Sequence, residues 1–128
     1  MTDYLTMAEV LAIHSDQIEC YGGSPGVRDR GLLEAGLYRP QTGYYADLIE
    51  EAAALWESLS QNHPFVDGNK RVAVTTMAAF LGVNGYRLEF DDIKAFSFLD
   101  ALYESGNLRF KELESWLRQH AVRADPLN

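Results

Sequence analysis

The segment His63–Arg71 constrains the fold of this chain more than any other, because it separates two apolar stretches with helical spacing. The stretches carry Leu48, Ala52, Leu55, Trp56 and Leu59 before the segment, and Val72, Thr76, Met77, Phe80 and Leu81 after it. Pro64 pushes the preceding residue out of the α region, so the first helix must end there. Asn69 is a favourable N-cap residue for the second helix. The sequence therefore predicts two central helices joined by a short loop.

Capping residues and glycine or proline stops outline the other helices. The expected helices occupy roughly residues 6–21, 29–39, 47–63, 69–84, 91–105 and 110–117. The segment Tyr86–Phe90 alternates in polarity and could form a strand, but it has no evident partner, so we expect an extended connector. The predicted fold class is all-α, a compact single-domain bundle of about six helices. The domain should span residues 1–128, with a frayed tail at 124–128.

Charge and composition exclude several classes of protein. The chain has 128 residues and a formal net charge of −8, which argues against direct binding to nucleic acid or to an anionic membrane. Cys20 is the only cysteine, which excludes a disulfide framework and indicates a reducing compartment. The start of the chain lacks the order of a signal peptide, and no apolar run approaches the ~20 residues of a membrane span. We therefore expect a soluble, cytoplasmic domain.

The residues from Gly68 to Arg71 have the chemistry of a phosphate site. The first turn of a helix has unpaired backbone N–H groups and partial positive charge, so it attracts anions. Gly68 allows an anion to approach the backbone closely. Lys70 and Arg71 place two cations in a turn that would normally favour acids, and a bound anion would remove this penalty. We expect Gly68, Asn69, Lys70 and Arg71 to bind phosphates.

Asp67 and His63 supply reactive groups beside this phosphate site. A carboxylate next to phosphates suits Mg²⁺, which takes one or two protein carboxylates and completes its shell with phosphate and water. An imidazole with a pKa of about 6.5 suits a general base for an attacking hydroxyl. Phe65 should enter the core and hold the loop, so that His63 and Asp67 face the same side.

Each of these residues also has an ordinary structural interpretation. His63 could be a helix C-cap, Asn69 an N-cap, and Asp67 part of a common turn. The two cations could simply face solvent. Their concentration in nine consecutive residues around an apolar anchor favours a functional site.

The same nine residues resemble the signature of the Fic/Doc family, a histidine–phenylalanine motif that ends in Gly-Asn-Gly-Arg or Asn-Lys-Arg. Lys70 stands where most Fic adenylyltransferases have glycine, which is more similar to the death-on-curing (Doc) toxins. His14 and the segment Tyr21–Gly26 also resemble Doc. The resemblance implies a Fic-like helical fold and a toxin of a toxin–antitoxin pair.

The resemblance also implies a role for each motif residue. His63 would be the catalytic base, Asp67 would hold Mg²⁺, and the residues after it would bind the phosphates of ATP. Thr75 stands where Doc has a polar amide, and it could still bind a phosphate. Fic enzymes usually transfer AMP to a protein hydroxyl, whereas Doc transfers the γ-phosphate to a threonine of elongation factor Tu and arrests translation.

Two positions favour the Doc-like reaction. Lys70 fills the space that a glycine would leave for phosphates, and Val74 stands where a further arginine is expected. An inverted nucleotide, with its γ-phosphate nearest His63, fits these changes better. Protein adenylylation with the same residues is the nearest alternative, and a non-catalytic module that binds nucleotide or antitoxin is another.

Regulation should come from a separate chain. Many Fic proteins carry an inhibitory helix of the form Ser/Thr-x-x-x-Glu-Gly/Asn, but no glutamate here is followed by Gly or Asn. The Doc resemblance therefore implies a separate, Phd-like antitoxin, which we expect in an apolar groove.

Several polar residues lie outside the motif. His14 shares a helix face with apolar residues, so it should be a core histidine bonded to a loop rather than a catalytic group. Arg39, Tyr44 and Tyr45 lie in a loop before the motif helices. This loop either docks an extended segment of the protein target or is an ordinary loop with partly buried tyrosines.

Overall fold

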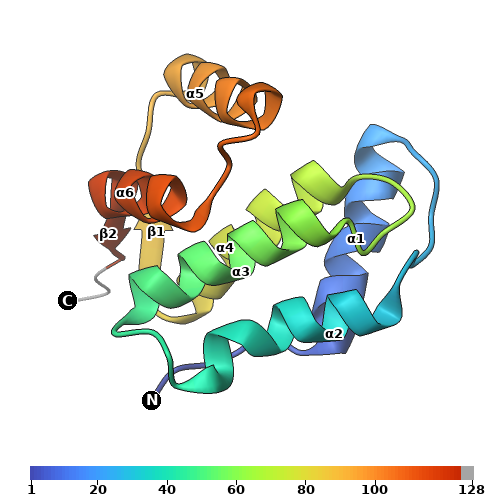
Figure 1. Cartoon of the computed structure of the whole chain (residues 1–128), viewed down its shortest axis with the longest axis horizontal. Coiled ribbons are helices and arrows are strands. Elements are labelled where there is room, and N and C mark those ends of the chain that lie inside the picture. The colour runs from blue at the N-terminus through green and yellow to red at the C-terminus, as the bar shows by residue number, and fades with distance from the viewer. Residues whose placement is uncertain (125–128) are drawn as a thin grey trace.

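The computed structural model describes residues 1–124 and confirms the all-α fold class (Figure 1). Its helices are α1 (Met7–Tyr21), α2 (Arg30–Tyr38), the 3-10 helix η1 (Arg39–Thr42), α3 (Leu48–Asn62), α4 (Asn69–Val83), α5 (Asp92–Ser105) and α6 (Phe110–His120). Within these residues, no helix has the length and apolar character that a membrane crossing requires. The tail expected to fray lies outside the described residues, apart from Ala124.

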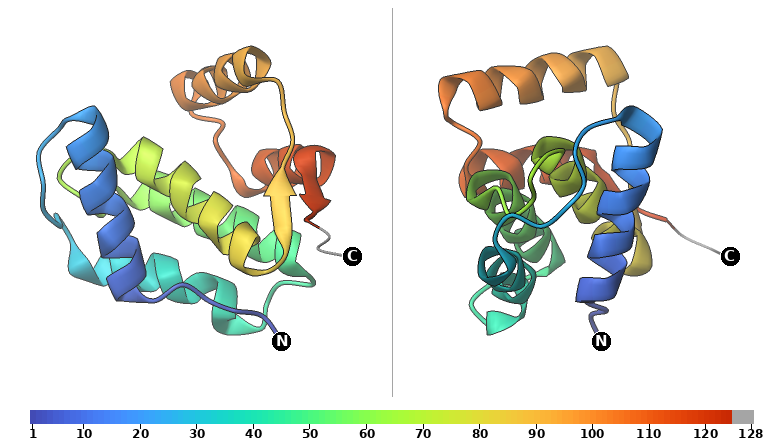
Figure 2. Two further views of the ribbon diagram at one scale, coloured as in Figure 1. Left: turned by 180° about the vertical axis from the view of Figure 1, so that it is seen from behind. Right: turned by 90° about the vertical axis from the view of Figure 1, so that its right-hand side faces the viewer.

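Helix α3 lies at the centre of the fold and packs against α2, α4 and α6 (Figures 1 and 2). One core joins these helices, and its largest fully buried side chains include Trp56, Phe65, Phe80, Leu33, Leu59, Met77, Leu81 and Leu117. Trp56 and Trp116 are both buried and meet edge to face with ring centroids 5.7 Å apart. Burial of each large apolar side chain contributes about 1.5–3 kcal/mol. The core therefore fixes the α3–α4 pair that carries the motif.

Side-chain caps begin four helices at the predicted positions. Thr6 and Glu9 form a reciprocal capping box at the start of α1. Asp29, Asp47 and Asp91 each accept a hydrogen bond from a backbone N–H in the first turn of α2, α3 and α5. Such a cap stabilises a helix by about 1 kcal/mol. These helix starts are therefore decided by residues within one turn.

The prediction of an unpaired connector at Tyr86–Phe90 was wrong. Tyr86–Leu88 forms strand β1, which pairs antiparallel with strand β2 (Ala121–Arg123) at the end of the chain. The register places Arg87 opposite Val122. The Ala124 N–H donates to the Gly85 carbonyl oxygen at 2.8 Å and extends the pairing. The partner lies more than thirty residues away and just after a helix, so local alternation could not reveal it.

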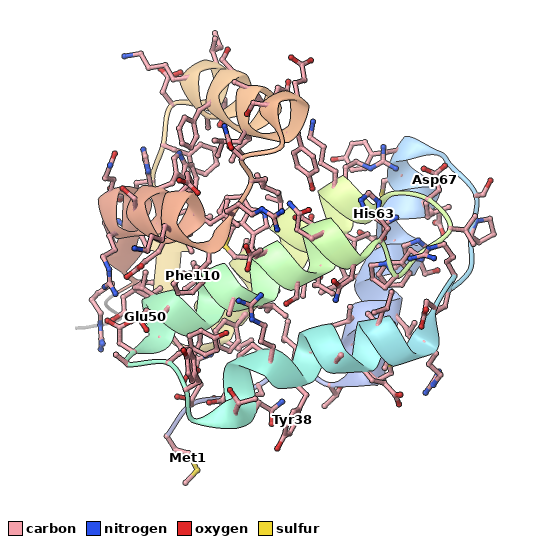
Figure 3. All side chains as sticks on the ribbon, in the orientation of Figure 1. Met1, Tyr38, Glu50, His63, Asp67 and Phe110 are labelled. Atoms are coloured by element: carbon pink, nitrogen blue, oxygen red, sulfur yellow. The ribbon has the colours of Figure 1, made fainter. Side chains whose placement is uncertain are left out.

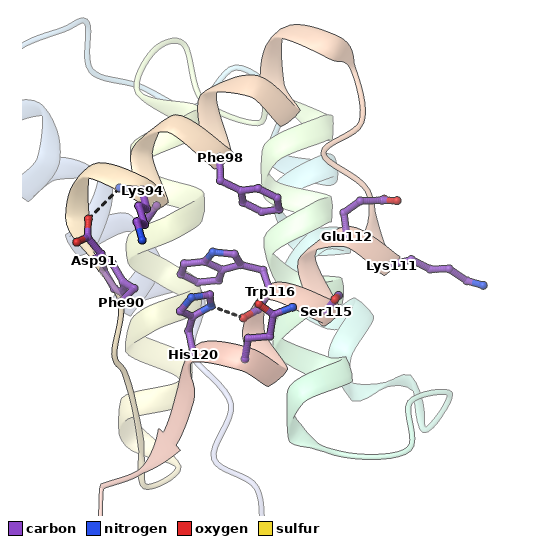
Figure 4. A pocket seen from close by; sticks show the side chains of 11 residues that line it. Phe90, Asp91, Lys94, Phe98, Lys111, Glu112, Ser115, Trp116 and His120 are labelled. Carbon is purple, nitrogen blue, oxygen red and sulfur yellow. Dashed lines mark hydrogen bonds between the residues drawn. The ribbon is translucent and has the colours of Figure 1, made fainter.

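Helix α5 is separated from the other helices by two cavities. A cavity of about 540 Å³ lies between α5 and α6, with Phe98, Trp116 and His120 among its lining residues (Figure 4). A second cavity of about 370 Å³ lies between α5 and the helices α1 and α4. Ile93 and Phe96 on α5 are largely exposed, whereas Ala95 and Leu99 face the core. α5 therefore packs on the domain through a narrow face.

Candidate active site

The motif loop connects the end of α3 to the start of α4 and is anchored in the core by one side chain. Phe65 is 1% exposed, which confirms that it enters the core and holds the loop. On either side of it, His63 and Asp67 are exposed at the same end of the molecule (Figure 3). His63 is the C-cap of α3, as its ordinary interpretation predicted, with φ 48° and ψ 57°. A helix end and a buried aromatic ring thus present the imidazole to solvent.

The prediction of Asn69 as the N-cap of α4 was wrong. Gly68 is the N-cap, with a left-handed φ of 76°, and Asn69 is the first helical residue. The Asn69 Oδ1 accepts from the Phe65 N–H, and its Nδ2 donates to the Phe65 carbonyl oxygen, both at 2.9 Å. The side chain is used here because the buried backbone of Phe65 needs partners. Asn69 can therefore offer a phosphate its backbone N–H while its amide closes the loop.

The N-terminus of α4 has the free donors expected of an anion site. Its first intrahelical bond runs from the Val72 N–H to the Gly68 carbonyl oxygen at 2.9 Å. The N–H groups of residues 69–71 therefore have no acceptor within the helix. No side chain among residues 1–124 caps this end. A phosphate would meet these N–H groups and the positive end of the helix dipole.

Asp67 keeps an ionised carboxylate beside this helix end. Its Oδ2 accepts from the Ser24 N–H at 3.1 Å and its Oδ1 from the Gly68 N–H at 2.8 Å. These two hydrogen bonds, first that of Ser24 and then that of Gly68, lower the pKa of the carboxyl group below its ordinary value. Each oxygen retains a further lone pair. An exposed, charged carboxylate next to a phosphate site fits Mg²⁺, which needs only one or two such ligands.

The two motif cations point toward neighbouring helices. The Lys70 Nζ lies 2.5 Å from the Asp100 Oδ1 on α5 and 4.8 Å from the centroid of the Tyr103 ring. The Arg71 Nη2 donates to the Gly22 carbonyl oxygen at 2.9 Å. Lys70, Arg71, Val74 and Thr75 all line the cavity of about 370 Å³ between α1, α4 and α5. The structure thus brings the side chains of Lys70, Arg71 and Thr75, three of the predicted phosphate ligands, together at one cavity beside the helix end.

His14, on α1, supports the motif loop from its buried side. It is 5% exposed, and its Nε2 donates to the Asp67 carbonyl oxygen at 3.0 Å. Its ring stacks on Phe65 with centroids 4.0 Å apart and an interplanar angle of 6°. This confirms the prediction of a buried histidine bonded to a loop.

The loop between α1 and α2 also supports the motif, which the sequence did not reveal. Val27 forms an isolated antiparallel bridge with Phe65, and the Val66 N–H donates to the Gly26 carbonyl oxygen at 3.0 Å. Arg28 donates from its side chain to the carbonyl oxygens of Asn62 and His63. The glycine-rich segment 22–26 predicts a helix stop and resembles Doc, but the sequence indicated no contact between it and the motif loop. Its unusual glycine content for a simple stop was the available signal of a close backbone approach.

The residues proposed for target docking are not part of this cluster. The Arg39 Nε donates to the Tyr45 hydroxyl at 2.7 Å, and its Nη1 bonds to Glu57 at 2.8 Å. These bonds hold η1 and the following loop against the middle of α3. Tyr44 differs, because the residue is 84% exposed. Arg39 and Tyr45 therefore have structural partners and are partly buried, whereas Tyr44 is largely open to solvent.

Comparison with known proteins agrees with this arrangement. The family model described as the Fic/DOC family matches residues 4–81, which include α1 and the whole motif. The chain belongs to the Fic/Doc family. It is 44% identical over 96 residues to the Toxin Doc of Mycolicibacterium smegmatis, covering 71% of this chain and 72% of that protein. It is 34% identical over 89 residues to the Protein kinase doc of Escherichia phage P1, covering 66% and 71%. Membership of this family implies a nucleotide substrate.

Proposed function

We propose that this protein is a Doc-type toxin that transfers the γ-phosphate of ATP to a threonine or serine hydroxyl of a translation factor, with elongation factor Tu as the target. The observation that carries the proposal is the motif loop, which has an imidazole at one end and a helix N-terminus with an ionised carboxylate at the other. The names of the two relatives, a toxin and a protein kinase, support the same reaction. Such a toxin would act in the cytoplasm.

In the proposed reaction, His63 takes the proton from the target hydroxyl. The hydroxyl oxygen forms a bond to the γ-phosphorus while the bond from that phosphorus to the β,γ-bridging oxygen breaks, and ADP leaves with this oxygen. The N–H groups at the start of α4, together with Lys70 and Arg71, stabilise the charge on the phosphates. Asp67 would hold Mg²⁺, which neutralises phosphate charge when bound. Thr75 is a further hydrogen-bond donor for the phosphates in the adjoining cavity.

The side chains along α4 support the inverted direction of the nucleotide. Lys70 and Val74 line the cavity next to the helix start, in the places where a Fic adenylyltransferase would have glycine and arginine. A triphosphate that runs along α4 would have less space, because Lys70 is bulkier than glycine. It would also lack one cation, because Val74 stands in place of arginine. A γ-phosphate placed at the helix start, near His63, avoids both problems. Adenylylation by the same residues is the alternative if the nucleotide binds in the usual direction.

An antitoxin partner and a single domain complete the proposal. A Doc-type toxin requires a separate antitoxin, and a Phd-like chain is the expected one. Residues 1–128 would form a single Fic/Doc domain. A non-catalytic module that binds nucleotide or antitoxin is the alternative of another class, because an anchored loop and an anion site do not by themselves require turnover.

Cell-free translation tests the catalytic proposal against the binding module. A catalyst should arrest translation when it is far less abundant than the ribosomes and elongation factors, because each molecule modifies many targets. The His63→Ala variant should leave translation running while it keeps the wild-type fold by circular dichroism. Arrest that needs one protein per target molecule, or that His63→Ala retains, would reject the catalytic proposal.

A further inference from the structure

The backbone of His63 has a conformation that its own sequence disfavours. Among residues 1–124 it is the only non-glycine residue with a positive φ, at 48°. A left-handed conformation is unfavourable for a residue with a Cβ, because the Cβ comes too close to the following carbonyl oxygen. Pro64 adds to this cost, because it favours extended backbone at the residue before it. Such a conformation persists at functional sites only where surrounding contacts hold it.

Arg28 makes the contacts that hold His63. Its Nε donates to the His63 carbonyl oxygen at 2.6 Å, and its Nη2 donates to the Asn62 carbonyl oxygen at 2.8 Å. Its backbone N–H donates to the Pro64 carbonyl oxygen at 2.7 Å. One residue from the α1–α2 loop therefore bonds to three consecutive carbonyl groups at the end of α3.

The end of α3 has no substitute for this side chain. The final carbonyl oxygens of a helix have no N–H donor within the helix and carry partial negative charge. The last turn of α3 contains no basic residue that could bind them. The planar guanidinium group can reach two carbonyl oxygens at once with a fixed geometry, which a lysine ammonium cannot match. The cation thus satisfies these oxygens and offsets the charge of the helix end.

We propose that Arg28 is a positioning residue, which holds His63 in the left-handed conformation that aims its imidazole at the target hydroxyl. The inference rests on the proposed role of His63 as the base. The other end of the loop is held by different contacts, from His14 to the Asp67 carbonyl oxygen and from Asn69 to Phe65. Loss of Arg28 should therefore release His63 while the phosphate site at the start of α4 keeps its shape.

The first test separates turnover from nucleotide binding. Arg28→Ala should lower the rate of phosphate transfer by about 10- to 100-fold, as expected when a catalytic group is misplaced by about 1 Å. The affinity for ATP should stay within twofold of wild type, and Arg28→Lys should give an intermediate rate. Arg30→Ala is the matched control, because Arg30 is exposed and contacts only Glu34 at 3.9 Å among the described ion pairs. In a His63→Ala background, Arg28→Ala should cause no further loss of turnover.

The second test does not depend on any activity. The chain has three histidines, so the imidazole signals of His14, His63 and His120 can be assigned by NMR. Arg28→Ala should shift or broaden the signal of His63 and leave that of His120, on α6, unchanged. If the wild type transfers no phosphate but this shift occurs, the proposed function fails and the positioning role stands. An unchanged His63 signal, a matching change from Arg30→Ala, or ATP affinity that falls as much as turnover would overturn the positioning role.

Discussion

The ammonium group of Lys70 lies 2.5 Å from the carboxylate of Asp100, although Lys70 is also a proposed phosphate ligand. Both side chains are about half exposed, at 49% and 54%. An ion pair this exposed contributes at most about 1 kcal/mol to stability. Its more important consequence concerns binding, because a phosphate must compete with Asp100 for the same cation.

Asp100→Asn should therefore strengthen ATP binding. The gain should be about two- to fivefold, since an exposed pair contributes roughly 0.5–1 kcal/mol. Titration calorimetry at constant salt would measure it. Asp92→Asn, on the same helix, is the matched control, because it changes the net charge equally but lies outside the cavity. Unchanged or weaker binding in Asp100→Asn would mean that Asp100 does not compete with phosphate.

Asp67 should contribute to stability in a pH-dependent way. The N–H groups of Ser24 and Gly68 hold the pKa of its carboxyl group below the ordinary 3.8, so its ionised form is favoured in the folded state. The contribution is therefore complete above that ordinary value and is lost as the pH falls through the lower folded pKa. Thermal melts should show the largest difference between wild type and Asp67→Asn near about pH 6, shrinking toward about pH 2–3. A difference that stays constant over this range would contradict the assignment.

Gly23 should tolerate a side chain less well than its neighbour Gly22. A Cβ on Gly23 would lie 2.8 Å from the Asp67 Oδ2 and 3.1 Å from the Ile18 Cδ1, whereas a Cβ on Gly22 would meet no atom within 4 Å. Both residues have positive φ, so the backbone strain of an alanine applies to both. Gly23→Ala should displace the carboxylate and reduce phosphate transfer by about 10-fold or more, as for other misplaced groups. Gly22→Ala should lower the melting temperature alone. Equal activity in the two variants would show that the Asp67 position does not matter for transfer.

Asn69→Asp should destabilise the protein, although it only replaces the side-chain amide with a carboxylate of similar size. The new carboxylate can still accept from the Phe65 N–H, but it places an oxygen against the Phe65 carbonyl oxygen, where an amide donor now lies. An unsatisfied and repelled group of this kind costs about 1–3 kcal/mol. Urea unfolding would measure the loss, with no change expected in the slope. A variant as stable as wild type would mean that the side chain does not close the loop.

The predictions of helix starts are confirmed where residues close in the sequence determine the structure. Thr6, Asp29, Asp47 and Asp91 cap helices because their side chains reach a backbone N–H within the first turn. Pro64 ends α3 by the same local logic. His14 was predicted as buried from periodicity, which reports the face that a helix turns to the core. Phe65 was predicted to enter the core as the apolar anchor of the motif loop, and it is buried.

The sequence-based predictions that failed, or that missed a contact, involve partners distant in the sequence or a residue suited to two local roles. The partner of Tyr86–Leu88 lies at the end of the chain, and Arg28 reaches α3 from a loop more than thirty residues earlier. Asn69 is suited both to cap α4 and to close the loop. It closes the loop, because the N–H and carbonyl groups of the buried Phe65 need hydrogen-bond partners. Tertiary contacts therefore determined what sequence patterns left open.

Transfer of the γ- or the α-phosphate distinguishes a kinase from an adenylyltransferase, and one labelling experiment measures which group moves. Purified elongation factor Tu, Mg²⁺ and the protein would be incubated with ATP labelled at either the γ- or the α-phosphate, with His63→Ala as the control. We expect transfer of the γ-label alone and its loss in His63→Ala. Transfer of the α-label would reject the proposed kinase and identify an adenylyltransferase that binds the nucleotide in the direction usual for Fic enzymes.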